Sequence, residues 1–185
     1  MRNKRLHLWL ALMVCVVSAP AYALLPIQHW QTGNGAQVYF VANRDLPMLD
    51  VSVDFPAGSA FDTREKSGLA ALTQSLLKLG AGGLPEDEIA RRMADVGAQL
   101  GGRFDSDRAG LSLRTLSSAE EMKEALGLLA RILQRPEFPP AVLEREKARI
   151  IGAIRESDTK PEVIADRNFN ALIYGDHPYG LRDSG

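Results

Sequence analysis

The sequence is poor in the side chains that bind metals and form disulfides. Its 185 residues contain one cysteine, Cys15, and three histidines. Cys15 lies in an N-terminal segment that we expect to be removed, so the mature chain has no disulfide, no thiol nucleophile and no thiolate metal site. His29 and His177 are far apart, and no His-x-x-x-His pair places two imidazoles on one helical face. We therefore interpret His29 as a strand residue and His177 as a residue that caps or hydrogen-bonds a turn.

Long hydrophobic runs are also missing. The apolar run Leu8–Val17 has ten residues, whereas a helix that crosses a bilayer needs about 20. Three basic residues precede this run, and Ala21-Tyr22-Ala23 follows it with the small-x-small pattern of a cleavage site. We predict a signal peptide, residues 1–23, cleaved after Ala23, and a periplasmic or secreted mature chain, residues 24–185. An uncleaved N-terminal anchor is the alternative.

The chain has no excess of positive charge. Its net charge is −1, and removal of the three basic residues before Leu8 makes the mature chain more acidic. A surface that binds nucleic acid needs clustered lysine and arginine, so we exclude this class of partner. With 45% hydrophobic and 24% charged residues, the chain has the composition of an ordinary globular domain.

Motifs for nucleophilic catalysis and phosphate binding are absent. No serine lies in a Gly-x-Ser-x-Gly elbow. The glycines of residues 80–83 follow a predicted helix instead of preceding one, so they are interpreted as a helix stop and turn. The carboxylates of residues 86–88 and 144–146 are interpreted as solvated charges on helices. The chemistry of the residues alone therefore indicates a globular domain without a visible active site.

Hydrophobic periodicity predicts several strands at period two and helices at period 3.6. Strands are expected over residues 27–32, 37–42, 49–55, 98–104 and 109–116. Helices are expected over residues 68–78, 85–96, 118–134, 141–157 and 161–174. The order βββααββααα predicts an α+β fold with a largely antiparallel sheet packed against helices. We expect all strands after the first to share one sheet, with Leu69, Leu72 and Leu76 packed against it.

Five motifs, in this order, resemble the N-terminal domain of the insulinase/pitrilysin-like zinc metallopeptidases, a family that includes the mitochondrial processing peptidase subunits. They are the bend Phe55–Ala60, the helix start Gly68-Leu69-Ala70, the turn at Gly80, the acidic and basic run Glu144–Lys147, and His177-Pro178-Tyr179. The resemblance covers residues 30–179. It implies that residues 24–185 are most of a first domain and that a second, homologous domain follows residue 185.

The resemblance also implies where catalytic members carry zinc. Their His-x-x-Glu-His motif falls on Ala71-Leu72-Thr73-Gln74-Ser75, so Ala71 and Ser75 replace the two histidines and Gln74 replaces the catalytic glutamate. The third ligand, a glutamate of the long helix, falls on Gly152. Alanine and glycine have no donor atom, serine is a poor zinc ligand, and glutamine cannot accept a proton from water. We therefore expect no catalytic, metal or cofactor-binding residue in this chain.

Three functions remain open on this evidence. The first is a non-catalytic subunit that supports peptide binding by an active, zinc-containing homologue and shares its peptide substrate. The second is a zinc-dependent peptidase whose catalytic site lies in a part beyond residue 185. The third is a scaffold without a substrate, as in the core subunits of respiratory complexes that share the fold.

Overall fold

The computed structural model describes residues 26–182, which divide after Leu46 into two compact units. The predicted signal peptide and its cleavage after Ala23 lie outside the described residues. Within residues 26–182, none of the helices has both the length and the apolar composition to cross a membrane.

The first unit contains an antiparallel hairpin. Strands β1 (Ile27–Gln31) and β2 (Gln37–Val41) pair along their whole length. The turn between them is closed by the Gly35 N–H, which donates to the Thr32 carbonyl at 2.9 Å. Gly35 has a φ of +90°, a conformation that glycine adopts without the steric penalty of a Cβ. The strands expected over residues 27–32 and 37–42 are thus confirmed, and this turn joins them.

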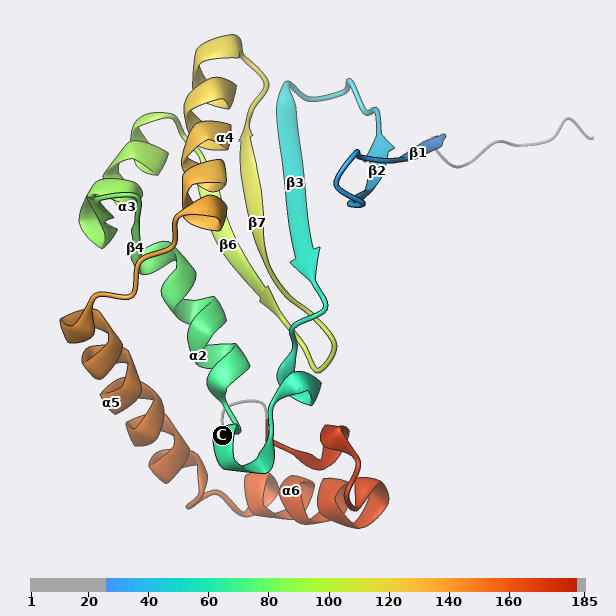
Figure 1. Ribbon diagram of the computed structural model, residues 1–185, viewed down its shortest axis with the longest axis vertical. Helices are drawn as coiled ribbons and strands as arrows, with labels where there is room; N and C mark the ends of the chain where they lie inside the picture. The colour runs from blue at the N-terminus through green and yellow to red at the C-terminus, as the bar shows by residue number, and fades with distance from the viewer. Residues whose placement is uncertain (1–25, 183–185) are drawn as a thin grey trace, which may run out of the picture. The chain divides into compact units, whose positions relative to one another are not determined.

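The second unit contains the sheet and all the α-helices of the described residues. Its strands are β3 (Met48–Phe55), β4 (Gly80–Ala81), β5 (Leu84–Pro85), β6 (Gln99–Phe104) and β7 (Ala109–Leu116). Its α-helices are α2 (Leu69–Leu76), α3 (Glu86–Asp95), α4 (Ala119–Gln134), α5 (Pro140–Ser157) and α6 (Pro161–Tyr174). Figure 1 shows α2, α3 and α4 on one face of the sheet, with α5 beside α2 and α6 beyond it.

The main sheet has three antiparallel strands in the order β3-β7-β6. Val53 lies opposite Leu111, and Leu111 lies opposite Gly102, so these three positions share the helix-covered face. The other face is polar, and there Arg114 pairs with Asp50 at 2.7 Å. This division follows from the alternation of apolar and polar residues along β3, because successive side chains of a strand point to opposite faces.

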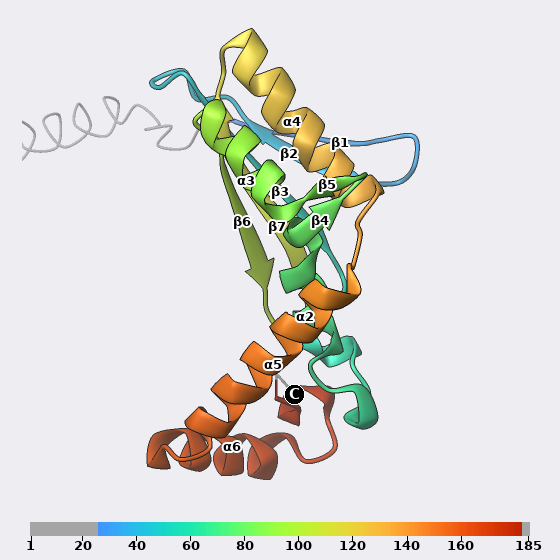
Figure 2. The same cartoon turned by 90° about the vertical axis from the view of Figure 1, so that its left-hand side faces the viewer.

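The core lies between this sheet and helices α3 and α4, which cover it in both views (Figures 1 and 2). Its buried members are Ala81, Ile89, Met93, Leu111, Leu113, Ala125, Leu128, Leu129 and Ile132. Full burial of one leucine or isoleucine contributes about 1.5–3 kcal/mol to folding. Two leucines of β7 and the buried residues of α4, which recur at helical spacing, therefore hold this part of the domain together.

Helices α5 and α6 begin with prolines, Pro140 and Pro161, at the position where the missing N–H removes no intrahelical bond. Ion pairs attach them to the rest of the unit. Arg145 of α5 bonds to Glu86 of α3 at 2.7 Å. After α6, Asp176 accepts from Arg64 at 2.7 Å, and the Arg182 guanidinium bonds to Asp158 at the end of α5 at 2.9 Å. Figure 2 shows α6 running across the far end of α5.

The α+β class and the mainly antiparallel pairing are confirmed, but one detail of the sheet prediction is wrong. The strand β2 does not share the sheet of β3; it pairs with β1 alone. Pro47, directly before β3, has no N–H for a hairpin bond, and Asn43 holds its own turn by accepting from the Asp45 N–H at 2.9 Å. The helix stop and turn expected at residues 80–83 are confirmed, since Gly82 and Gly83 form the turn, and the short strands β4 and β5 flank it.

The leucine stripe of α2 was also assigned too simply. Leu76 is buried, as predicted, but Leu69 is 50% exposed. Leu72 lines a groove between α2 and α5 instead of packing on the sheet. The side of α2 that reaches the sheet carries Gln74, whose amide bonds to β7. The apolar period therefore located the helix correctly but not the element against which each leucine packs.

Candidate functional site

The start of α2 fixes the register of the five positions 71–75. Gly68 precedes the helix with a φ of +88°, which favours glycine. The Asp62 carboxylate accepts from the backbone N–H groups of Gly68 at 2.9 Å and Ala70 at 3.1 Å. These bonds satisfy donors that a helix N-terminus leaves without partners. The predicted Gly-Leu-Ala helix start is thus a capped N-terminus.

Gln74 lies against the hairpin of β6 and β7. Its Nε2 donates to the Gly110 carbonyl of β7 at 3.2 Å. Its amide also fills the space beside Gly102 of β6, because a Cβ placed on Gly102 would overlap Nε2. The side chain is partly buried. The residue that stands at the position of a catalytic base is therefore a contact between the helix and the sheet.

Ser75 and Ala71 lie one helical turn apart on the same side of α2, as the i, i+4 spacing predicts. The Ser75 hydroxyl donates to the Leu72 carbonyl of its own helix at 2.8 Å. Ala71 offers only a methyl group. The two side chains do not fit zinc, which takes imidazole, thiolate or carboxylate ligands.

The structure does not bring Gly152 together with these positions. Gly152 is exposed, and a Cβ placed on it has no neighbour within 4 Å. Ile150 and Ile154 face α2 across a groove, and at about 100° per residue Gly152 points roughly 160° from each of them. Ala153 is exposed as well, but it points about 60° from Ile150 and about 100° from Ile154. By helix angle, position 153 therefore lies nearer than position 152 to these two groove residues.

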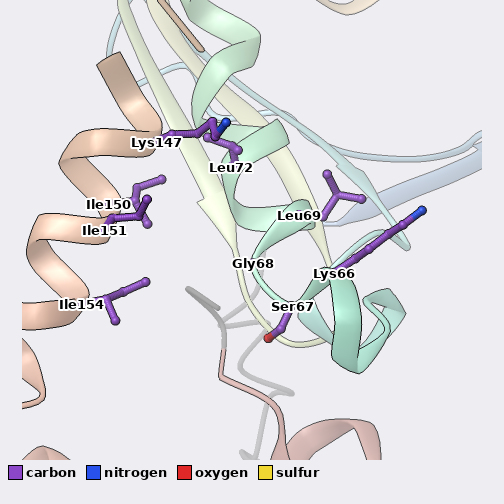
Figure 3. Close-up of a pocket in the computed structure, with 9 residues that line it drawn as sticks. All are labelled: Lys66, Ser67, Gly68, Leu69, Leu72, Lys147, Ile150, Ile151 and Ile154. Carbon is purple, nitrogen blue, oxygen red and sulfur yellow. The ribbon is translucent and has the colours of Figure 1, made fainter. Parts of the chain in front are cut away.

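The groove between α2 and α5 has a volume of about 600 Å³. Figure 3 shows Ile150, Ile151 and Ile154 extending from α5 toward Leu69 and Leu72 of α2 and the loop before it. The remaining lining residues are Lys66, Ser67, Gly68 and Lys147. The lining contains no imidazole, thiol or carboxylate, so the groove can receive apolar side chains but offers none of the usual protein ligands of zinc.

A buried carboxylate lies on α5 near this groove. Glu146 is 8% exposed and accepts hydrogen bonds from Arg149 at 2.7 Å and from Arg145 at 3.1 Å. The hydrogen bond from Arg149 is the largest cause of a lowered pKa of Glu146, and the bond from Arg145 adds to it. Burial acts in the opposite direction and raises this pKa. Glu146 therefore stays ionised as part of a charge cluster and is no proton donor at neutral pH.

Both histidines have the structural roles expected for them. The His29 Nε2 lies 2.8 Å from the Gln37 side-chain oxygen, and the ring stacks on Tyr39 across the hairpin. His177 caps a short 3₁₀ turn, where its Nδ1 accepts from the Tyr179 N–H at 3.2 Å. Among residues 26–182, no three His, Cys, Asp or Glu side chains are grouped so that they could hold a metal ion.

Sequence reasoning missed the pairing of Gln74 with Gly102 and Gly110. A signal for it was present, because two adjacent glycines inside a predicted strand, Gly101 and Gly102, mark a place where another group comes close to the backbone. What the sequence could not indicate was which group this is.

The comparisons with known proteins agree with this geometry. The sequence model described as insulinase (peptidase family M16) matches residues 39–182. The crystal structure of a peptidase M16 inactive domain from Pseudomonas fluorescens superposes with a TM-score of 0.84 and 35% identity, over 87% of this chain and 39% of that one.

Two curated relatives are more distant. "Probable mitochondrial-processing peptidase subunit beta" of Arabidopsis thaliana is 23% identical over 80% of this chain and 27% of its own length. An "Uncharacterized zinc protease" of Rickettsia felis is 22% identical over 76% of this chain and 34% of its own length. The chain thus spans about a third of the length of the curated relatives that it matches.

Proposed function

The chain belongs to the insulinase family, peptidase family M16, and we propose that it is a non-catalytic member that supports peptide binding by an active homologous subunit. The observation that carries this proposal is the environment of positions 71, 74 and 75. Ala71 has no donor atom, the Ser75 hydroxyl bonds to its own helix, and the Gln74 amide bonds to β7. Rearranging these side chains cannot create a metal site, because none of them is a good zinc ligand.

The similarity to an M16 inactive domain supports the same reading, because 35% identity over 87% of this chain is well above the identity to the zinc protease relative. The relative named as a peptidase subunit supports an assembly of homologous chains. The signal-like segment before Leu24 supports a periplasmic location for that assembly.

The strand β6 offers a surface for an extended peptide. It is an edge strand, since it pairs with β7 on one side and with no other strand of the described residues. Free main-chain groups at a sheet edge can pair with an added strand. Gly101 and Gly102 lie in the middle of β6, and residues without side chains allow a second backbone to approach closely.

The experiment is to express the mature chain with and without a homologue from the same genome that retains His-x-x-Glu-His. Fluorescein-labelled oxidised insulin B chain serves as the extended peptide. We expect the chain alone to bind the peptide without cutting it, and we expect its presence to lower the KM of the homologue with little change in kcat. If the KM is the same with and without this chain, the proposal is refuted.

A zinc-dependent peptidase with a catalytic site beyond residue 185 is the second candidate. It is favoured by the zinc protease relative, of which this chain spans 34%. The full-length gene product, purified without any homologue, distinguishes the two functions. Cleavage of the labelled B chain that stops with a zinc chelator would establish the peptidase and exclude the non-catalytic subunit.

A further inference from the structure

Gln74 joins the helix α2 to both strands of the β6–β7 hairpin. Its Nε2 donates to the Gly110 carbonyl on β7 at 3.2 Å, and the same amide occupies the space beside Gly102 on β6. Gly102 lies on the helix-covered face of the edge strand, opposite Leu111. We call the contact of Gln74 with Gly102 and Gly110 the clasp. It lies where α2 meets the edge strand.

Near its centre β6 has few side chains of its own to pack on α2, although Leu100 beside it packs against the core. A strand on the edge of a sheet is held by one ladder only, and glycines at 101 and 102 leave its centre without side chains to pack on α2. At this point of the helix–sheet contact, the Gln74 amide fills the gap that a larger residue in β6 would otherwise fill.

We propose that Gln74 is a positioning residue for peptide binding, which holds the centre of β6 against α2 so that its outer main-chain groups stay aligned for an added strand. This inference rests on the proposed function, because it assumes that peptides bind at β6. The position that the resemblance assigns to a catalytic glutamate thus holds a residue that positions a strand.

The test is the change Gln74→Glu, which keeps the size of the side chain. An ionised carboxylate cannot donate to the Gly110 carbonyl, whereas a protonated one can. We expect the affinity for the labelled insulin B chain to fall about fivefold relative to wild type at pH 8, and to return to within about twofold of it at pH 4.5. Thr73→Glu adds the same charge at an exposed neighbour on α2 and should leave the affinity unchanged.

A double-mutant cycle tests the contact with Gly102. Gly102→Ala should weaken peptide binding in the wild-type background, because the new methyl group displaces the Gln74 amide. In the Gln74→Ala background it should have no further effect, because the amide is already gone. Additive effects of Gly102→Ala and Gln74→Ala would overturn the proposal.

Amide hydrogen exchange separates this proposal from the function on which it rests. Gln74→Glu should increase exchange in β6 at pH 8 whether or not peptides bind there. If the wild-type chain binds no peptide, the proposed function fails, while faster exchange would still establish the clasp. If peptide binds the wild type and Gln74→Glu alters exchange but not affinity, Gln74 is structural only and the positioning role is refuted.

Discussion

A zinc site can be built between α2 and α5 if the third ligand is placed at the residue that faces α2. The change is Ala71→His and Ser75→His on α2 combined with Ala153→Glu on α5. The two histidines would lie at i and i+4 on one side of the helix. That side lies between Gln74, which reaches the sheet, and Leu72, which lines the groove toward α5. Gln74 stays unchanged, so its bond to β7 is kept.

The expected effect is large enough to measure by thermal unfolding. Three protein ligands suit zinc and leave one position for water. Zinc at about 100 times its dissociation constant would stabilise the folded chain by about 2.7 kcal/mol. For a domain of this size that corresponds to a rise in Tm of about 10 °C. We expect no peptide cleavage, because glutamine at position 74 cannot take a proton from water.

The matched control carries Gly152→Glu in place of Ala153→Glu with the same two histidines. Both positions are exposed, but position 152 points roughly 160° from Ile150 and Ile154, whereas position 153 points about 60° from Ile150, so zinc should raise the Tm of this variant much less. The unaltered chain should show no shift, and its elemental analysis should give no stoichiometric zinc. A larger shift with Gly152→Glu than with Ala153→Glu would refute the helix-geometry argument, and no shift in either would show that α2 and α5 do not converge there.

Three further changes test the packing and the charges of the domain. Thr115 has a buried hydroxyl without a hydrogen-bond partner, so Thr115→Val should stabilise the chain by about 1–2 kcal/mol. Thr32→Val removes a hydrogen-bonded hydroxyl and should not stabilise the chain. Urea unfolding measures the free energy of unfolding of both variants. A Cβ on Gly58 would overlap backbone atoms of the β6–β7 turn, so Gly58→Ala should destabilise by more than about 2 kcal/mol, and an unchanged urea midpoint would contradict this geometry. The pKa of Glu146 is lowered in the folded chain, so its ionised form stabilises the fold above the ordinary pKa of about 4.3, and this stability is lost as the pH falls through the lower folded-state pKa. Glu146→Gln should therefore be less stable than the wild type at pH 7 and should lose less stability between pH 5 and pH 2. A parallel loss of stability in both proteins would argue against the ion cluster.

Local sequence patterns predicted most elements of the fold. The alternation along β3 and the three- or four-residue spacing of leucines along α2 each follow from contacts within one element. Prolines at the starts of α5 and α6 act within a single turn. Such features need no knowledge of the rest of the chain, and the structure has them within a few residues of the predicted bounds.

Relations between elements were harder to predict. The sheet was expected to include β2, which pairs only with β1. Leu72 was expected on the sheet and instead lines the groove opposite Ile150. Both errors have one cause, because an amphipathic pattern tells which side of an element is apolar but not which neighbour covers it. The assignment of a ligand position to Gly152 rests on the resemblance alone, and it stays a prediction.

The proposed absence of zinc ligands in this chain is compatible with an intact fold because other contacts hold the same helices. Asp62 caps the start of α2 through two backbone N–H groups, and Gln74 attaches its middle to β7. Arg145 attaches α5 to Glu86 of α3 through an ion pair of 2.7 Å. None of these contacts involves Ala71 or Ser75. A metal bound at these positions would add stability to helices that other contacts already hold, so the domain does not depend on a metal for its fold.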